Sequence, residues 1–300
     1  MLWLLYVSLS ALFFGLGNIV EKILVSKYVK DSTIFGYTVL TYFGYSSFLF
    51  LFLPFIQFSK ITPIILLLIC IRALLNLMFY YFWIKLMLKE EISRIIGILF
   101  VYTLIAVFFD YLLYSTKVSL LFYIGALLLI LSSILMSYKP SKESFIEKKD
   151  IMYLTAIIII WGFYGILLKS ITNRLDHIPT FLFLETASVL IAASIVTFSS
   201  KRIQNEIKTF FPQKKLFWAG IILVNLFYLI GLLTSFKAYD LQLISYVAPF
   251  ESLQPTFVFI IALVLSLFFP AFLKEETDKK TIGYKIAALI LLVIGIFLIL

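Results

Sequence analysis

Long apolar runs separated by short polar gaps make up almost the whole chain. A run of about 20 apolar residues is long enough for one helix to cross the hydrocarbon core of a bilayer. The runs lack the period of two that a barrel strand shows, so helices are the way to satisfy the backbone in lipid. The pattern predicts ten transmembrane helices, at residues 2–25, 33–56, 62–84, 93–114, 119–138, 151–171, 179–199, 215–236, 243–268 and 281–300.

The composition supports a membrane protein over a soluble one. Of the 300 residues, 63% are hydrophobic and 14% are charged. Soluble domains are about 45–50% apolar and about 25% charged, and their cores could not absorb this much apolar surface. We therefore expect an all-α integral membrane protein that is multi-pass and has no extramembrane domain.

The net charge of +9 is concentrated in the gaps between apolar runs. Of 25 Lys and Arg residues, 18 lie in or beside the gaps after predicted helices 1, 3, 5, 7 and 9, and four lie in the other gaps. The remaining three are Lys22, Arg72 and Lys169. Membrane orientation and lipid headgroups explain this pattern better than nucleic acid does, and the positive-inside rule places both termini outside.

The longest polar stretch, residues 139–150, divides the chain into two sets of five helices, 1–147 and 148–300. Residues recur in the same order in both sets, with offsets that drift only from 145 to 158. The matches, first set before second, are Gly15 and Gly162, Lys22 and Lys169, Asp31 and Asp176, Lys85 and Lys237, Ile92 and Ile244, Ser93 and Ser245, and Gly125 and Gly283.

Five is an odd number, so two copies joined by a short loop enter the membrane in opposite directions. The sequence thus predicts a 5+5 inverted-topology repeat, an architecture common among secondary transporters. Exchanging the roles of the halves gives two nearly equivalent arrangements, and hence alternating access. The alternative is that duplication merely built a larger helical bundle.

Several segments resemble the drug/metabolite transporter superfamily in its EamA-like ten-helix branch. These are FFGLGNIVEKIL in the first helix, IWGFYGILLKS in the sixth, SFKAYDLQLISYVAPFESLQPTFVF leading into the ninth, and the Ile-Gly pair that opens the tenth after Glu275 and Glu276. The first half departs from the pattern, with Gly97 at the position of Pro249 and Lys117 at that of Glu275. The resemblance implies a carrier of small organic solutes with both termini inside, opposite to the charge count.

Polar residues within the predicted spans mark the candidate site, because each ionisable group there costs roughly 2.5–3.5 kcal/mol on insertion. Glu251 and Gln254 lie one turn apart between Pro249 and Pro255, which free backbone carbonyls. We expect a central cavity between helices 1, 3, 4, 6, 8 and 9. The candidate substrate-binding residues are Asn18, Arg72, Asn76, Tyr102, Trp161, Asn225, Tyr228, Glu251 and Gln254.

Two of these residues carry opposite charges. Arg72 would bind a carboxylate or another anionic group, since its planar fork suits bidentate contact. Glu251 would bind an amine or carry a coupled proton. The alternative is a structural ion pair between Arg72 and Glu251. We expect Glu185 to bond to a neighbouring helix and His177 to lie in a loop or cap a helix.

Lys22 and Lys169 end their predicted helices in both halves of the chain. Their ammonium groups could snorkel to the headgroups or line the mouths of the cavity.

The inventory of chemical groups argues against an enzyme. A single histidine excludes a multi-histidine metal site, and no HExxH, GxSxG, phosphate-binding loop or Asp-rich site occurs. We expect no cofactor, no metal and no nucleotide-driven pumping.

The predicted function is secondary transport, by alternating access, of a small organic solute such as an amino acid or related metabolite across the cytoplasmic membrane. The protein would work as a monomer or homodimer, with coupling to protons left open. The alternatives are a lipid scramblase or flippase and a membrane-embedded enzyme.

Overall fold

The structure is a computed structural model that describes residues 2–90, 92–115, 119–138, 148–268 and 279–299. Lys117, Glu275, Glu276 and most of the predicted linker lie outside the described residues. Within the described ranges the chain forms helices and no strand. In these ranges nine helices are long and apolar enough to cross a membrane, and Leu120–Met136 is a shorter apolar helix. This confirms the predicted all-α integral membrane protein.

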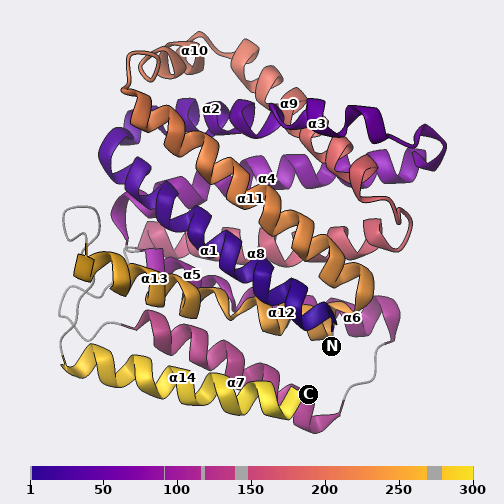
Figure 1. Ribbon diagram of the computed structural model, residues 1–300, viewed down its shortest axis with the longest axis vertical. Helices are drawn as coiled ribbons and strands as arrows, with labels where there is room; N and C mark the ends of the chain where they lie inside the picture. Colours follow the sequence, from indigo (N-terminus) through magenta and orange to yellow (C-terminus); the bar gives the residue numbers. More distant parts are fainter. Residues whose placement is uncertain (1, 91, 116–118, 139–147, 269–278, 300) are drawn as a thin grey trace.

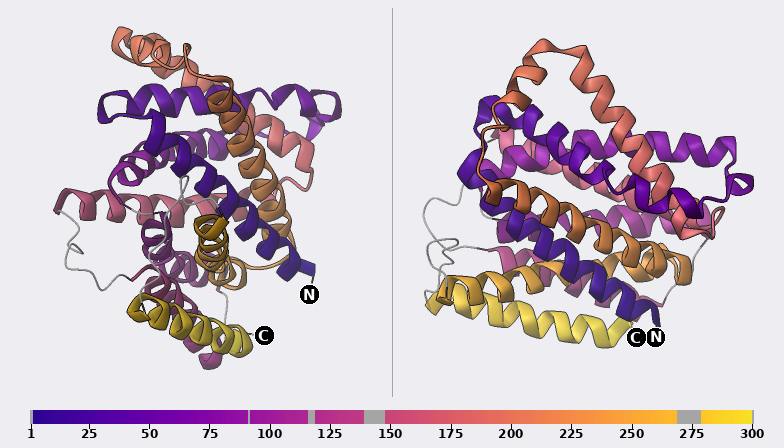
Figure 2. Two further views of the ribbon diagram at one scale, coloured as in Figure 1. Left: turned by 60° about the vertical axis from the view of Figure 1, so that its left-hand side comes forward. Right: turned by 45° about the horizontal axis from the view of Figure 1, so that its top comes forward.

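The helices follow one another in the predicted order and run across the molecule in alternating directions (Figure 1). Figure 2 shows the two ends of the chain close together on one side. The first span is α1 (Leu2–Tyr28), and the second consists of the segments η1 (Asp31–Thr33), α2 (Ile34–Ser46), α3 (Leu49–Phe52) and η2 (Leu53–Phe55). The third is α4 (Pro63–Lys89), the fourth is α5 (Ile92–Leu99) with α6 (Tyr102–Tyr114), and the fifth is α7 (Leu120–Ser137). The second set of five consists of α8 (Lys148–Thr172), α9 (Ile178–Ser199), α11 (Lys215–Leu241), α12 (Ile244–Glu251) with α13 (Gln254–Phe268), and α14 (Lys279–Ile299). The short helices η3 (Phe58–Lys60) and α10 (Lys201–Lys208) lie in the gaps.

Three helices extend beyond their predicted ends. α1 continues to Tyr28, α4 to Lys89 and α11 to Leu241, where hydropathy alone predicts ends at residues 25, 84 and 236. The added turns carry charged side chains such as Lys89. A long side chain can keep its charge in a polar environment while its helix continues through the headgroup region, so the first charge does not mark the end of the helix.

The fourth and ninth spans are each interrupted near their middle. α5 and α12 begin and end 152 residues apart, and α6 and α13 also begin 152 residues apart. In the ninth span Pro249 lies inside α12 and Pro255 in the first turn of α13, so two backbone N–H groups are missing around the break. The fourth span is interrupted at the same position without a proline.

The two sets of five helices interlock rather than lying side by side. α1 of the first set packs along α11 of the second, and α8 of the second set packs along α4 of the first. α2 packs against α9, and α7 against α14 at the outer edge (Figure 1). In the order of the spans, α1 corresponds to α8 and α4 to α11, so exchanging the two sets converts the α1–α11 pair into the α8–α4 pair. The pairs α2–α9 and α7–α14 each join corresponding helices and stay the same.

Two lysines at equivalent positions hold helix ends together. Lys22 of α1 donates to the carbonyl oxygens of Met87 and Glu90, the second at 2.8 Å, where α4 ends. Lys169 of α8 donates to the carbonyls of Tyr239 at 2.6 Å and Gln242 at 3.0 Å, where α11 ends. A cation is favourable at a helix C-terminus. Both ammonium groups therefore bind the C-terminal end of a neighbouring helix.

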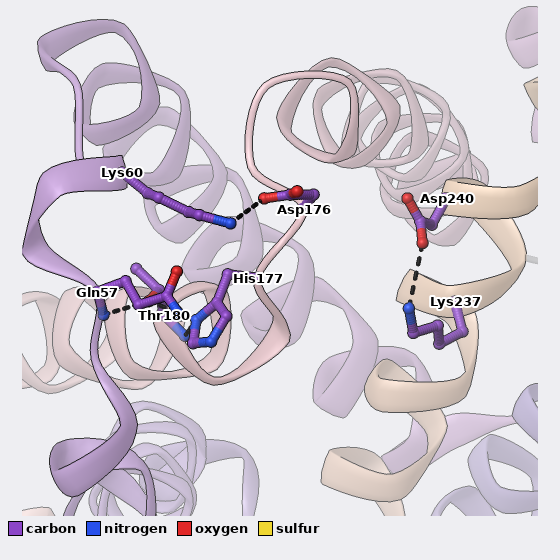
Figure 3. Close-up of polar contacts among 7 residues, drawn as sticks. All are labelled: Gln57, Lys60, Asp176, His177, Thr180, Lys237 and Asp240. Atoms are coloured by element: carbon purple, nitrogen blue, oxygen red, sulfur yellow. Dashed lines mark hydrogen bonds and ion pairs between the residues drawn. The ribbon is translucent and has the colours of Figure 1, made fainter.

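Polar contacts order the loops at the face where α4 and α9 begin (Figure 3). Lys60 Nζ lies 2.5 Å from Asp176 Oδ1, and this contact lowers the pKa of Asp176. The Nδ1 atom of His177 accepts from the Thr180 backbone N–H at 3.3 Å, which confirms the helix-cap expectation for His177. The Thr180 hydroxyl in turn accepts from the Gln57 backbone N–H at 2.9 Å and links the two loops.

Candidate functional site

A cavity of about 120 Å³ lies near the middle of the spans, among the described residues. It is lined from the broken spans and from α1, α2, α4, α8, α9 and α11, so α2 and α9 join the helices expected from the sequence. The structure brings eight of the nine candidate residues to its wall, and Arg72 lies behind the wall. The eight are Asn18, Asn76, Tyr102, Trp161, Asn225, Tyr228, Glu251 and Gln254.

One face of α11 supplies the longest strip of the wall. Its lining residues follow a spacing of three and four, which places them in one row along a helix. They are Asn225, Tyr228, Leu232, Ser235 and Tyr239. The row joins two carboxyl groups, because it contacts Glu21 near one end and Glu251 near the other.

Gly17 of α1 lets one member of this row approach closely. A Cβ atom at Gly17 would lie 2.6 Å from the Tyr228 ring, so any larger residue would displace that ring. In its observed position the Tyr228 hydroxyl lies 2.7 Å from both Asn18 Oδ1 and Glu21 Oε2.

Glu251 ends α12 at the break in the ninth span and faces the cavity. Its Oε2 accepts hydrogen bonds from the hydroxyls of Tyr102 and Tyr239, the second at 3.3 Å, and its Oε1 accepts from Ser235 at 3.3 Å. No ion pair is formed with Glu251 by the Lys and Arg residues that the structure describes. Hydroxyl donors, rather than a cation of the described chain, therefore hold this carboxyl group in place.

Asp110 of α6 fixes the other end of α12. It accepts from the backbone N–H of Ser245 at 3.2 Å and also from the Ser245 hydroxyl. An anion at a helix N-terminus is stabilised by the unpaired N–H groups and the helix dipole. The short helix that presents Glu251 is therefore anchored at its start, a role for Asp110 that the sequence did not indicate.

Arg72 is closed off from the cavity by its own partners. It is fully buried, and its Nε lies 3.1 and 3.2 Å from the two carboxylate oxygens of Glu185 in α9. Its guanidinium lies 3.6 Å over the Tyr164 ring, whose hydroxyl donates to Glu185 at 2.9 Å. The ion pair of Arg72 is thus with Glu185, not with Glu251, and Glu185 does bond to a neighbouring helix as expected.

Glu21 is a third carboxyl group of the site, and the sequence reasoning missed it. It lies one turn beyond Asn18 in α1 and is fully buried. Its Oε2 accepts from Trp83 Nε1 at 3.2 Å and lies 2.7 Å from the Tyr228 hydroxyl oxygen, while its Oε1 has no hydrogen-bond partner. The spacing from Asn18 was the available signal, because residues three apart share a helix face.

Aromatic rings form most of the remaining wall. Trp161 lies near their centre, with ring centroids 4.6 Å from Phe79 and 5.0 Å from Tyr164. The faces of such rings attract cations. No Lys or Arg is among the lining residues, and the described chain holds no cluster of His, Cys, Asp and Glu that could bind a metal ion. The cavity therefore suits a small solute with a positively charged group and an apolar body.

Solved structures share this fold. One crystal structure, described only as that of a protein, matches with a TM-score of 0.62 and 13% sequence identity, covering 96% of this chain and 96% of the other. At that identity the likeness concerns the fold alone. No curated protein matches the sequence.

A family model matches the first half of the chain. The matched region, residues 1–138, is the half in which the motifs of the sequence analysis are less clear. The match confirms the resemblance to the drug/metabolite transporter superfamily and agrees with the multi-pass helical structure. Residues 1–138 match the model of a family described as the EamA-like transporter family.

Proposed function

We propose that the protein is a secondary transporter that moves a small organic solute with a protonated amine, such as an amino acid or related metabolite, across the cytoplasmic membrane. The observation that carries this proposal is Glu251, a carboxylate that faces a mid-span cavity, accepts from three hydroxyl groups and forms no ion pair with a Lys or Arg of the described chain. An ammonium group bound there would complete the pairing of the carboxylate and lie against aromatic faces.

Alternating access is supported by correspondences between residues 1–147 and 148–300. The two broken spans match at an offset of 152, the main helix pairs exchange with each other, and Lys22 and Lys169 bind equivalent helix ends. We interpret these features as an inverted repeat. The halves could then exchange roles and open the cavity to one side of the membrane at a time.

The size and polarity of the cavity narrow the class of solute. At about 120 Å³ it is far smaller than the roughly 300–1,000 Å³ of a drug-sized pocket, which favours a metabolite over a phospholipid. Arg72 is bound to Glu185, so a solute carboxylate would be met by amide groups instead. The lining amides are Asn18, Asn76, Asn225 and Gln254.

The test is counterflow into liposomes that contain the purified protein. Labelled proteinogenic amino acids and the amines obtained by decarboxylating them would be screened, together with a fluorescent phospholipid. We expect one or more amine-bearing solutes to exchange and the lipid not to cross. Glu251→Gln should reduce exchange at least about tenfold, since a charged hydrogen-bonding partner contributes about 1.5–3 kcal/mol.

Glu206→Gln is the matched control. Glu206 is a buried glutamate outside the cavity, where it accepts from the Gly36 backbone N–H at 2.9 Å. This variant should exchange solute like the wild type. Lipid scrambling without solute exchange, or full exchange by Glu251→Gln, would contradict the proposed function.

A further inference from the structure

Glu21 and Glu251 are carboxyl groups in different chemical surroundings, although the row on α11 touches both. Glu251 lines the cavity, and hydroxyl groups donate to both of its oxygens. Glu21 is fully buried behind the wall, and only one of its oxygens accepts hydrogen bonds. The other, Oε1, is buried without a partner.

An ionised carboxylate in such a place is unstable. Transfer of an isolated carboxylate into an apolar interior is so unfavourable that the group neutralises instead, by binding a proton or a cation. No ion pair to Glu21 is formed among the residues that the structure describes. A metal cation would need several oxygen ligands, whereas Oε1 has no polar partner. The surroundings of Glu21 therefore favour a bound proton.

The hydrogen bonds of Tyr228 lead to the same conclusion. A tyrosine hydroxyl has one proton to donate and lone pairs to accept with. With Asn18 oriented as in the structure, Asn18 Oδ1 and Glu21 Oε2 both lie 2.7 Å from the Tyr228 oxygen. Asn18 Oδ1 can only accept. Both contacts are full hydrogen bonds when Tyr228 donates to Asn18 and a protonated Glu21 donates to Tyr228.

Several helices pack against α1 near Glu21 and bring titratable or polar groups toward it. Lys22 follows it on α1 but donates to the carbonyls at the end of α4. The described side chains of α5 are apolar, and Glu251 of α12 is bonded to its own hydroxyl donors. The titratable or polar groups that face Glu21 are Tyr37 and Tyr42 of α2, Trp83 of α4 and Tyr228 of α11.

We propose that Glu21 is a proton-binding site separate from the solute site at Glu251, and that its protonation couples transport to the proton gradient. A proton from water on one side of the membrane adds to the Glu21 carboxylate and later returns to water on the other side, with no other bond changed. Tyr228 lines the cavity and its hydroxyl bonds to Glu21, so this residue connects Glu21 with the cavity. The coupling part of this inference rests on the proposed transport function.

Infrared difference spectroscopy tests the proton site without any solute. Spectra of the wild-type protein in liposomes at acid and alkaline pH should contain a C=O stretching band from a buried protonated carboxyl group. Glu21→Gln should remove this band and keep an amide of similar size that can accept from Trp83 and donate to Tyr228. Glu185→Gln is the matched control and should retain the band, because Glu185 is already paired with Arg72.

Tyr228→Phe is the second variant and leaves the carboxyl group in place. It removes one hydrogen bond from Glu21, so the band should shift in frequency. A band that persists in Glu21→Gln, or that does not move in Tyr228→Phe, comes from another carboxyl group and overturns the proposal. So does the absence of the band from the wild type.

Transport then tests the coupling. Using the solutes of the counterflow screen, Glu21→Gln should keep exchange but lose accumulation driven by an imposed pH gradient, falling to the level reached without the gradient. Glu251→Gln should lose both. Accumulation by Glu21→Gln at the wild-type level would overturn the coupling. If the wild type moves no solute while the band disappears in Glu21→Gln, the proton site stands and only the proposed function fails.

Discussion

Two carboxylates, Glu185 and Glu251, face the same cavity and differ in what balances their charge. Glu185 forms an ion pair with Arg72 at 3.1 Å and accepts from Tyr164 as well. Glu251 receives only hydroxyl groups. The first is satisfied by the protein itself, whereas the second keeps room for a positive charge from outside.

The difference separates stability from function within one wall. The ion pair connects α4, α8 and α9 through Arg72, Glu185 and Tyr164. Glu251 bonds only to hydroxyl groups of α6 and α11, and in the proposed function its charge is balanced by the solute. The same residue type at mid-span therefore has two roles, and the location of its counter-charge decides which.

Breaking the closed pair should have the largest effect. Arg72→Gln leaves Glu185 buried without its cation, and the loss of one partner of a buried pair costs about 3–5 kcal/mol. Thermal unfolding of the purified protein would measure this. Replacing both residues, as Arg72→Met with Glu185→Leu, should recover most of the loss, because no buried charge remains. A double variant as unstable as Arg72→Gln would show that the pair contributes more than mutual neutralisation.

Weakening the open site should have a smaller effect, on transport rather than on stability. Tyr102→Phe removes one hydroxyl donor to Glu251, a loss of about 1.5–3 kcal/mol for a bond to a charged group. Counterflow should fall roughly tenfold or more at low solute concentration. Tyr37→Phe is the control, since the Tyr37 hydroxyl is buried without a partner and Tyr37 is not among the residues that line the cavity. Equal effects of the two variants would mean that the hydroxyl groups around Glu251 have no special role.

The smallest effect should come from the ion pair between Lys60 and Asp176, where the carboxylate is 77% exposed. The contact lowers the pKa of Asp176 in the folded protein. It therefore stabilises the fold at neutral pH, and this contribution disappears as the pH falls below about 4, near the ordinary pKa of Asp. Lys60→Gln should unfold slightly earlier than the wild type at neutral pH and together with it at acid pH. A gap that persists at acid pH would assign Lys60 a role other than pairing with Asp176.

The helices could be predicted well from the sequence, because a spanning helix needs a continuous run of apolar residues and such runs are visible in the sequence itself. Ends were less accurate where a helix continues through charged residues, as α4 does to Lys89. The break in the ninth span follows from Pro249 and Pro255. The matching break in the fourth span carries no proline, so only its correspondence with the ninth could have indicated it.

The site was predicted in part, for a physical reason. Helical spacing tells which residues share a face of one helix, and it placed Glu251 beside Gln254. It does not tell which helices become neighbours, so the alternative to a binding role paired Arg72 with Glu251, whereas the partner of Arg72 is Glu185 of α9. Glu21 was missed because it precedes Lys22 near a predicted helix end, although α1 continues to Tyr28.

The pairing of α1 with α11 has a consequence for how the protein is made. Glu21 bonds to Tyr228, which follows it by 207 residues, so α1 enters the membrane long before its main partner exists. During synthesis the buried carboxyl group has only the lipid and the first few helices around it. The first half therefore cannot reach its final packing while it is the only part synthesised, and α1 can take its final position only after α11 has been made.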